Sequence, residues 1–182
     1  MVAKKIKANR IKPEKNLAVV NPQLIHLNGI RVLKAHIEMT NELMDNPEEI
    51  HGFSVGAKSE SGFNLGANFL RFRLFLKING MDKNGKSIDI KGEYVIEFHY
   101  EIENLKSFAH YTNKDDYLMA DIIGATIAGI SYSTARGIIL ERTLGTDFDG
   151  VILPVIDPKD LLQKDTFTKK SKNKRQPKKA KA

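Results

Sequence analysis

The chain of 182 residues contains no cysteine. Disulfide bonds, thiolate metal sites and cysteine nucleophiles are therefore excluded. The basic N-terminus, MVAKKIKANRIKPEKN, is not followed by an apolar segment, so it lacks the pattern of a secretory signal. Long apolar runs are also absent. In the most apolar stretch, 14 residues separate Asp121 from Arg136, which is too few for a helix to cross a bilayer. These absences predict a cytoplasmic protein.

Catalytic signatures are lacking as well. The chain has no GxxxxGK[ST], no GxGxxG after a strand, no HExxH and no GxSxG. His99 lies between Glu97 and Glu101, a spacing that could hold a metal, but basic residues on the neighbouring strand favour a solvated ionic face. The sequence 147–150, DFDG, resembles the start of a calcium loop, yet Pro158 stands where the loop needs its glutamate. We therefore expect no metal, no cofactor and no enzyme activity, and an enzyme or small-ligand pocket is the least favoured interpretation.

The net charge of +7 is unevenly distributed. Residues 169–182 contain eight Lys or Arg and no acid, and residues 1–15 contain six Lys or Arg and one Glu. Since these two segments carry +8 and +5, the remaining residues 16–168 carry −6. Lysine-rich segments with few aromatic residues and no periodicity are typical of disorder. We divide the chain into a basic disordered arm, a domain and a basic disordered tail: 1–20, 21–165 and 166–182.

The composition of the basic tail is compatible with two different functions. It could bind nucleic acid through phosphate contacts, or it could only make the protein more soluble. No aromatic residue follows Phe167 to stack on bases. A nucleic-acid-associated structural protein is therefore the alternative function, and deletion of residues 169–182 distinguishes it, since it predicts the loss of salt-sensitive binding.

Period-2 alternation predicts four strands. The first two cover about residues 24–39 and 50–65, with a bulge expected at Asn28-Gly29. Residues 69–78 and 88–103 alternate most regularly, with apolar residues at even positions and mostly charged residues at odd positions. The two regular strands flank a turn that contains Gly85, so they form a hairpin with one dry face and one wet face.

A long helix is predicted after the strands, beginning near Asp115-Asp116, whose carboxylates suit a helix N-terminus. Its large residues would cover the dry face of the sheet: Leu118, Ile122, Tyr132 and Ile139. Its glycine and alanine residues would form a second surface where the helix of another copy can approach closely.

An apolar crossover follows the helix. Pro154 and Pro158 prevent it from completing a strand ladder and keep it extended. For most of its apolar residues, a place in the core is the favoured interpretation. An extended apolar loop along a sheet also predicts a binding groove, however. The residues that are open to both interpretations are Phe148, Val151, Ile152, Leu153, Val155 and Ile156.

Three short motifs resemble the SecB family of protein-export chaperones. They are Ile123-Gly124-Ala125, Tyr132-Ser133-Thr134-Ala135-Arg136 and Leu153-Pro154-Val155-Ile156-Asp157, and they are similar to the family pattern "LGA … PYAR … L(A)PVNF". The resemblance covers about residues 24–162. With Ala135-Arg136 aligned to the end of PYAR, the tyrosine of that motif is not retained, and Ile156-Asp157 replaces the Asn-Phe pair.

The resemblance implies an α+β fold: a four-stranded antiparallel sheet packed by a long helix, with an extended crossover loop and a short second helix. It also implies a dimer of dimers, in which strand edges pair and the long helices lie between two sheets. Members of the family bind unfolded preproteins in grooves between sheet and crossover, without ATP. They pass them to the SecA motor, which docks partly on an acidic sheet surface.

Applied to this chain, the resemblance assigns three sets of residues. The client-binding groove would be formed by Phe53, Val55, Phe148, Val151, Ile152, Leu153, Leu161 and Leu162. The oligomer helix contact would be formed by Gly124, Ala125, Ala128, Gly129, Tyr132 and Ala135. The acidic partner surface would be formed by Glu93, Glu97, Glu101 and Glu103.

Our leading hypothesis is an ATP-independent holdase that binds non-native polypeptides and assembles as a homo-oligomer. Its partner would be a translocase motor or, since SecB-like proteins also serve single partners, a dedicated client such as an antitoxin. The sequence does not identify the client.

Overall fold

The computed structural model describes residues 19–40, 50–111, 117–146, 148 and 151–162. The predicted basic arm and basic tail lie almost entirely outside these ranges, and so does the predicted helix start at Asp115-Asp116.

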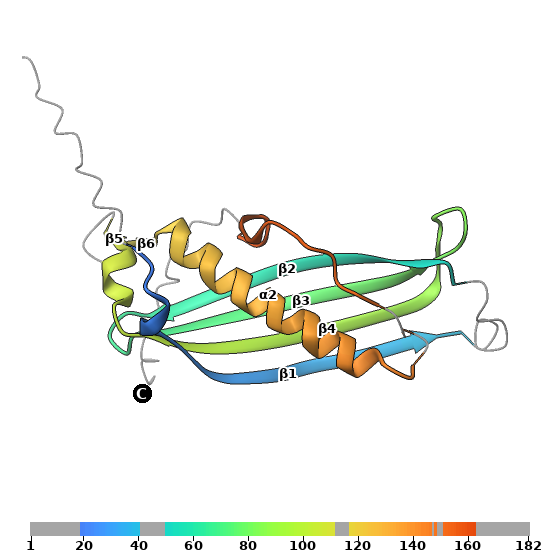
Figure 1. The fold of residues 1–182 in the computed structure, drawn as a ribbon, viewed down its shortest axis with the longest axis horizontal. Helices are drawn as coiled ribbons and strands as arrows, with labels where there is room; N and C mark the ends of the chain where they lie inside the picture. The colour runs from blue at the N-terminus through green and yellow to red at the C-terminus, as the bar shows by residue number, and fades with distance from the viewer. Residues whose placement is uncertain (1–18, 41–49, 112–116, 147, 149–150, 163–182) are drawn as a thin grey trace, which may run out of the picture.

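Four long strands form one antiparallel sheet in the order β1-β4-β3-β2. Helix α2 crosses one face of this sheet diagonally, and the crossover returns from the end of α2 along the sheet (Figure 1). The predicted α+β fold is therefore confirmed. The bounds are β1 (Ile25–Met39), β2 (Gly52–Asn64), β3 (Phe69–Met81), β4 (Ser87–Ile102) and α2 (Asp121–Thr143), with 3-10 helices η1 (Pro22–Leu24), η3 (Leu105–Phe108) and η4 (Pro158–Leu161).

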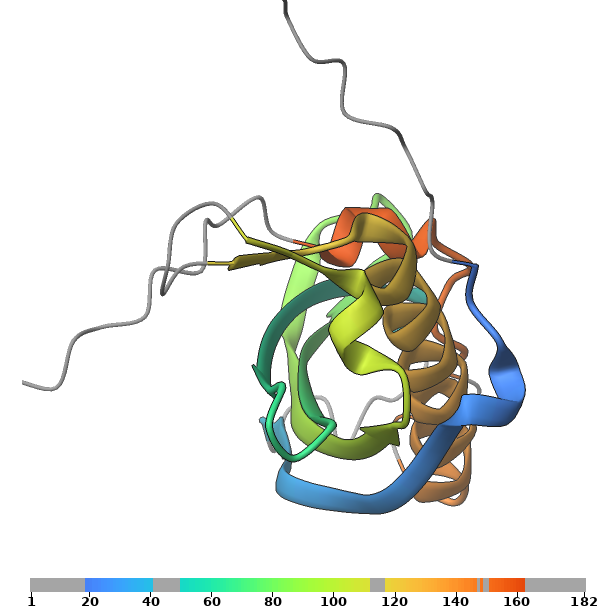
Figure 2. The same ribbon diagram turned by 90° about the vertical axis from the view of Figure 1, so that its left-hand side faces the viewer.

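The alternation of β3 and β4 determines which face of the sheet is buried. Their apolar even positions point toward α2 and supply eleven of the 23 buried apolar residues in the described ranges, because successive side chains on a strand face opposite sides. Seen from its end, the sheet curls around this helix (Figure 2). The buried members on β3 and β4 are Leu70, Phe72, Leu74, Leu76, Ile78, Ile90, Tyr94, Ile96, Phe98, Tyr100 and Ile102.

Two local predictions about the strands are confirmed. The pairing of β1 with β4 shifts register between Leu27 and Gly29, and again between Val32 and Lys34. In the β3–β4 turn, Gly85 has a φ of 75°, a left-handed conformation that favours glycine. The Asp82 side chain accepts hydrogen bonds from the amides of Asn84 and Lys86, both at 2.8 Å, and this turn keeps the β3–β4 hairpin tight.

The helix begins later than the sequence predicted. Residues 117–119 form a short strand, β6 (Tyr117–Met119), which pairs with β5 (Ala109–Tyr111). This pairing keeps the backbone extended through Ala120, so α2 starts at Asp121. The prediction that Leu118 and Ile122 cover the dry face is wrong, because both are exposed.

The middle of α2 packs on the sheet. Ile123, Ile127 and Ile139 are buried, and the Tyr100 hydroxyl lies 2.8 Å from Ser131 Oγ, so a buried hydrogen bond joins β4 to the helix. Among the described helices, α2 is long and apolar enough to qualify as a membrane span. This is weak support for a span, because helices in protein cores pass the same test and eight residues of α2 are buried.

Candidate functional site

The crossover runs alongside β2 between two contact points. Phe148 stacks on Phe53 near the start of β2, with ring centroids 5.4 Å apart and planes at 21°. At the other end, Ser59 Oγ donates a hydrogen bond to the Leu161 carbonyl. Ser59 lies six positions after Phe53, which is about 20 Å of strand. The thirteen residue-to-residue steps from Phe148 to Leu161 could span roughly 43 Å when extended, so the crossover is longer than the direct path between its two anchors.

Two side chains of α2 hold the middle of the crossover. Arg136 Nε donates to the Leu153 carbonyl at 2.9 Å, and the Tyr132 hydroxyl donates to the Pro154 carbonyl at 3.0 Å. The helix and crossover motifs that resemble the SecB pattern are therefore bonded to each other. These two hydrogen bonds satisfy carbonyl groups that an extended loop would otherwise leave unpaired.

The glycines of α2 make room for the end of the crossover. A Cβ atom on Gly124 would lie 3.3 Å from Leu162, and one on Gly129 would lie 3.3 Å from Pro158. Ala128, Tyr132 and Ala135 are buried. Most of the face predicted as the oligomer helix contact is thus occupied by residues of the same chain, with Ala125 half-buried beside it. Another helix could not approach this face unless η4 moved away.

The crossover has a buried side and an exposed side. Phe148, Val151 and Leu153 are buried, whereas Ile152 is 65% exposed and Val155 is 83% exposed. Pro154 also points outward. The two large apolar side chains on the exposed side are therefore held in place but remain in contact with solvent.

The edge strand β2 completes the exposed apolar surface. From Gly52 to Ala57 it has no charged residue, and Phe53 and Val55 are only half-buried. Its pairing with β3 is continuous and has no bulge. No backbone hydrogen bond joins β2 to the described part of the crossover. Such an uncharged, regular edge leaves backbone groups free to pair with another strand. We name Phe53, Val55, Ile152 and Val155 the apolar strip.

The eight predicted groove residues therefore fall into two groups. Phe148, Val151, Leu153 and Leu161 are buried in the core. Phe53, Val55 and Leu162 are half-buried, and Ile152 is exposed. Val155, which the sequence left open between core and groove and which is not among the eight, is more exposed than any of them.

The four glutamates of the predicted acidic surface lie on or next to the outer side of β4, but each has a partner. Glu93 pairs with Lys34 and with Lys77, and these two lysines hold its pKa below the ordinary value. Glu103 pairs with His26 at 2.9 Å. The Glu101 carboxylate accepts a hydrogen bond from Asn28 at 3.1 Å.

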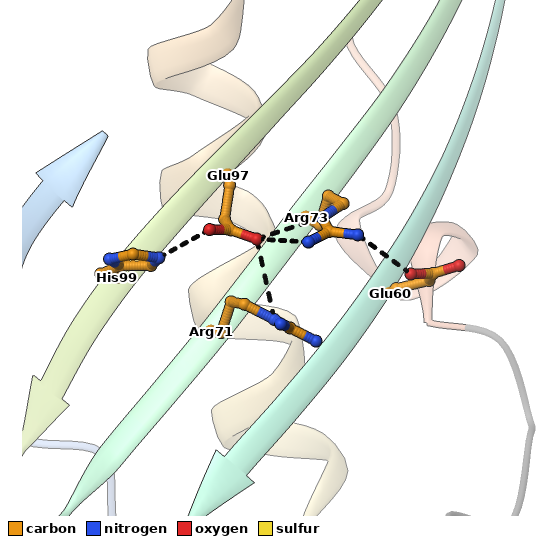
Figure 3. A network of polar contacts seen from close by, with 5 residues as sticks. All are labelled: Glu60, Arg71, Arg73, Glu97 and His99. Atoms are coloured by element: carbon orange, nitrogen blue, oxygen red, sulfur yellow. Dashed lines mark hydrogen bonds and ion pairs between the residues drawn. The ribbon is translucent and has the colours of Figure 1, made fainter. Parts of the chain in front are cut away.

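Glu97 has the most elaborate set of partners (Figure 3). It accepts hydrogen bonds from Arg73 at 2.6 and 3.1 Å, and His99 Nε2 lies 2.8 Å from its other oxygen. The Arg73 guanidinium and His99 hold the pKa of Glu97 below its usual value. This face therefore combines both signs of charge. Within the described ranges, no group of three His, Asp or Glu residues could hold a metal ion.

Comparison with known proteins identifies the fold. No family model matches the chain, and no curated protein matches it. Among solved structures, it is similar to a SecB-like chaperone of Mycobacterium tuberculosis, which was solved with a ChAD peptide from the HigA1 antitoxin. The TM-score is 0.52 at 9% sequence identity, over 74% of this chain and 91% of that one. This likeness shows a SecB-like fold.

A second solved structure, a protein of unknown function from Streptococcus agalactiae, is also similar. Its TM-score is 0.36 at 16% identity, over 72% of this chain and 97% of that one.

Proposed function

We propose that this protein is an ATP-independent chaperone that holds extended segments of non-native polypeptide against the apolar strip. The observation that carries the proposal is the exposure of Ile152 and Val155 on a crossover that is anchored beside the Gly52–Ala57 part of the edge strand β2. An extended client could pair its backbone with β2 and place alternate side chains against the strip. The chaperone fold of the mycobacterial neighbour supports this function.

Burial of the two crossover side chains supplies the driving force. Full burial of a Val or Ile side chain contributes about 1.5–3 kcal/mol, and backbone pairing with β2 adds affinity that does not depend on client sequence. A site of this kind requires an extended segment that carries apolar side chains at alternate positions.

The test is protection of a chemically denatured client protein from aggregation at a near-equimolar ratio, measured by light scattering. The wild-type protein should slow aggregation, and Ile152→Asp/Val155→Asp should lose most of this protection. Val19→Asp is the matched control, since Val19 is 81% exposed and lies outside the strip. Equal protection by the wild type and the double variant would refute the proposal, as would a wild type that gives none.

We further propose that the client is one dedicated partner and not the cargo of a translocase motor. The mycobacterial neighbour was solved with an antitoxin peptide, which is an example of such a partner. In this chain, Glu93, Glu97 and Glu103 are paired with basic or histidine side chains. Paired glutamates make the outer face a poor match for a motor that needs an acidic surface.

The proposed assembly surface is the outward side of α2. Ile122, Ile130 and Leu140 are exposed by 45, 39 and 40%, and they lie within about 80° of each other around the helix. Gly137 lies on the same side with open space around it. The hydroxyls of Thr126 and Thr134 are bonded to carbonyls of their own helix. This side is therefore apolar and has few unsatisfied polar groups, as a contact between copies requires.

A further inference from the structure

The outer face of the sheet, which is turned away from α2, contains a row of four residues with glycine at both ends. Gly29 of β1 pairs with His99 of β4. His99 also pairs with Arg71 of β3, which pairs in turn with Gly62 of β2. Because β1 and β2 are the two edge strands, the row is open at both edges of the sheet, and only His99 and Arg71 carry side chains. We name these four residues the glycine-bounded row.

The adjacent row contains two more arginines. Arg31 of β1 pairs with Glu97 of β4, which pairs with Arg73 of β3. The Glu97 side chain is 8% exposed, and Arg73 and His99 occupy its two oxygens. Glu97 therefore has little remaining capacity to neutralise a further cation.

Arg71 is held less tightly than Arg73 (Figure 3). Its Nε lies 3.8 Å from Glu97, which is too long for a hydrogen bond, and its side chain is 44% exposed. Its Nη2 lies 3.6 Å from the position that a Cβ on Gly62 would occupy, so the guanidinium lies next to the glycine. Arg31 is exposed, and it has no ion pair with any residue that the structure describes. Two guanidinium groups thus keep donors that are open to a ligand.

We propose that the glycine-bounded row, together with Arg31, docks an acidic segment of a partner polypeptide. A planar guanidinium matches a carboxylate with two parallel hydrogen bonds. Glycine at both ends lets the backbone of an extended segment approach closely. Phe69 stands edge-on to His99, with ring centroids 5.5 Å apart, and supplies an apolar contact for the segment. This surface lies on the face opposite α2 and is independent of the apolar strip.

The charges on either side of the row favour a polypeptide over a nucleic acid. Arg31, Arg71 and Arg73 lie next to Glu60 and Glu97, so positive and negative side chains alternate on one side of the row. Glu101 lies on the other side of the row. A nucleic-acid strand carries a phosphate about every 3.4 Å, and successive phosphates would meet these glutamates. An acidic peptide can place single carboxylates between neutral residues.

The test is a titration of the full chain with a short peptide of alternating glutamate and alanine, followed by backbone amide NMR at physiological salt. The amides of Gly29 and Gly62 should shift and saturate. Arg71→Lys keeps the positive charge but cannot make a bidentate hydrogen bond to a carboxylate. Arg31→Ala removes the exposed guanidinium on the edge strand β1. Each should weaken binding by roughly tenfold. Lys91→Ala, the matched control on the same face, should change it less than about twofold.

Weaker binding in either arginine variant, with Lys91→Ala unchanged and the dispersion of sheet amides intact, would support the proposal. Three results would overturn it. The first is chemical-shift changes confined to the basic tail. The second is a loss of binding in Lys91→Ala as large as the loss in the arginine variants. The third is a change in the amide shifts of Gly29 and Gly62 with a thymidine oligonucleotide but not with the peptide.

Discussion

Glu97 is a buried carboxylate on the outer face of β4, the face that is turned away from α2. Its side chain is buried because Arg73, Arg71 and His99 surround it. A carboxylate that accepts hydrogen bonds from cations favours its charged form. The ion pair between Arg73 and Glu97 holds β3 and β4 in register on the outer face. The packing of apolar side chains holds the same register on the inner face.

The pKa of Glu97 leads to a pH-dependent prediction. Since the folded pKa lies below the ordinary 4.5, Glu97 stabilises the fold above that pH, and the contribution is lost as the pH falls through the folded pKa. Glu97→Gln should lower the free energy of unfolding at pH 7 by about 1–3 kcal/mol. It should also flatten the loss of stability below about pH 5. Urea unfolding at a series of pH values measures both effects.

Glu60→Gln is the control for this prediction. Glu60 is 62% exposed and lies 4.0 Å from Arg73, so its replacement should change stability by less than about 1 kcal/mol. If the two variants had the same stability at pH 7, the structural role of Glu97 would be disproved.

The sheet could be predicted element by element because the sequence alternates with a period of two and only one face is apolar. The start of α2 could not be predicted in this way. Residues 117–119 pair with 109–111 as three-residue strands, which are too short to show a period. The apolar spacing of Leu118 and Ile122 also fits a helix, so the tertiary pairing decides the local structure.

The crossover shows a different limit. From Val151 to Ile156 every residue except Pro154 is apolar, so no alternation marks which side faces the core. The exposed side is set by the hydrogen bonds from Tyr132 and Arg136 and by the packing of Pro158 on Gly129. These contacts depend on residues that are about 20 positions away in sequence, and they become visible only in the folded chain.

Loss of the helix hydrogen bonds should loosen the crossover alone. Tyr132→Phe/Arg136→Met removes both donors to the carbonyls of Leu153 and Pro154. Amide hydrogens of residues 151–157 should exchange faster by tenfold or more, since each lost bond is worth about 1 kcal/mol.

Hydrogen exchange with mass spectrometry measures this change, with β3 and β4 as internal references. Arg142→Met is the control, because Arg142 is exposed near the end of α2 and makes no hydrogen bond to the described part of the crossover. Unchanged exchange in residues 151–157 of the double variant would show that packing alone holds the segment.

The whole molecule has separate candidate surfaces for assembly and for clients. The outward side of α2 presents Ile122, Ile130 and Leu140, whereas the apolar strip lies beside β2. Because the two surfaces share no residue, variants can remove one function and leave the other.

Ile130→Glu/Leu140→Glu should convert the oligomer to a monomer, because a charge at the centre of an apolar interface costs several kcal/mol when it is unpaired. Light scattering coupled to size exclusion measures the molar mass.

Val155→Glu should keep the oligomer mass and lose client protection. A wild type that is monomeric at micromolar concentration would exclude the proposed assembly surface.

Tyr132 and Arg136 connect the two surfaces. They hold the crossover from the same helix that presents Ile130 and Leu140 to solvent. Any rotation of α2 about its axis therefore displaces the carbonyls of Leu153 and Pro154, and with them the neighbouring side chains of Ile152 and Val155. Thermodynamic reciprocity then applies: if association of copies changes client affinity by some factor, client binding changes the association constant by the same factor. Rotation of α2 would then couple the association of copies to client binding.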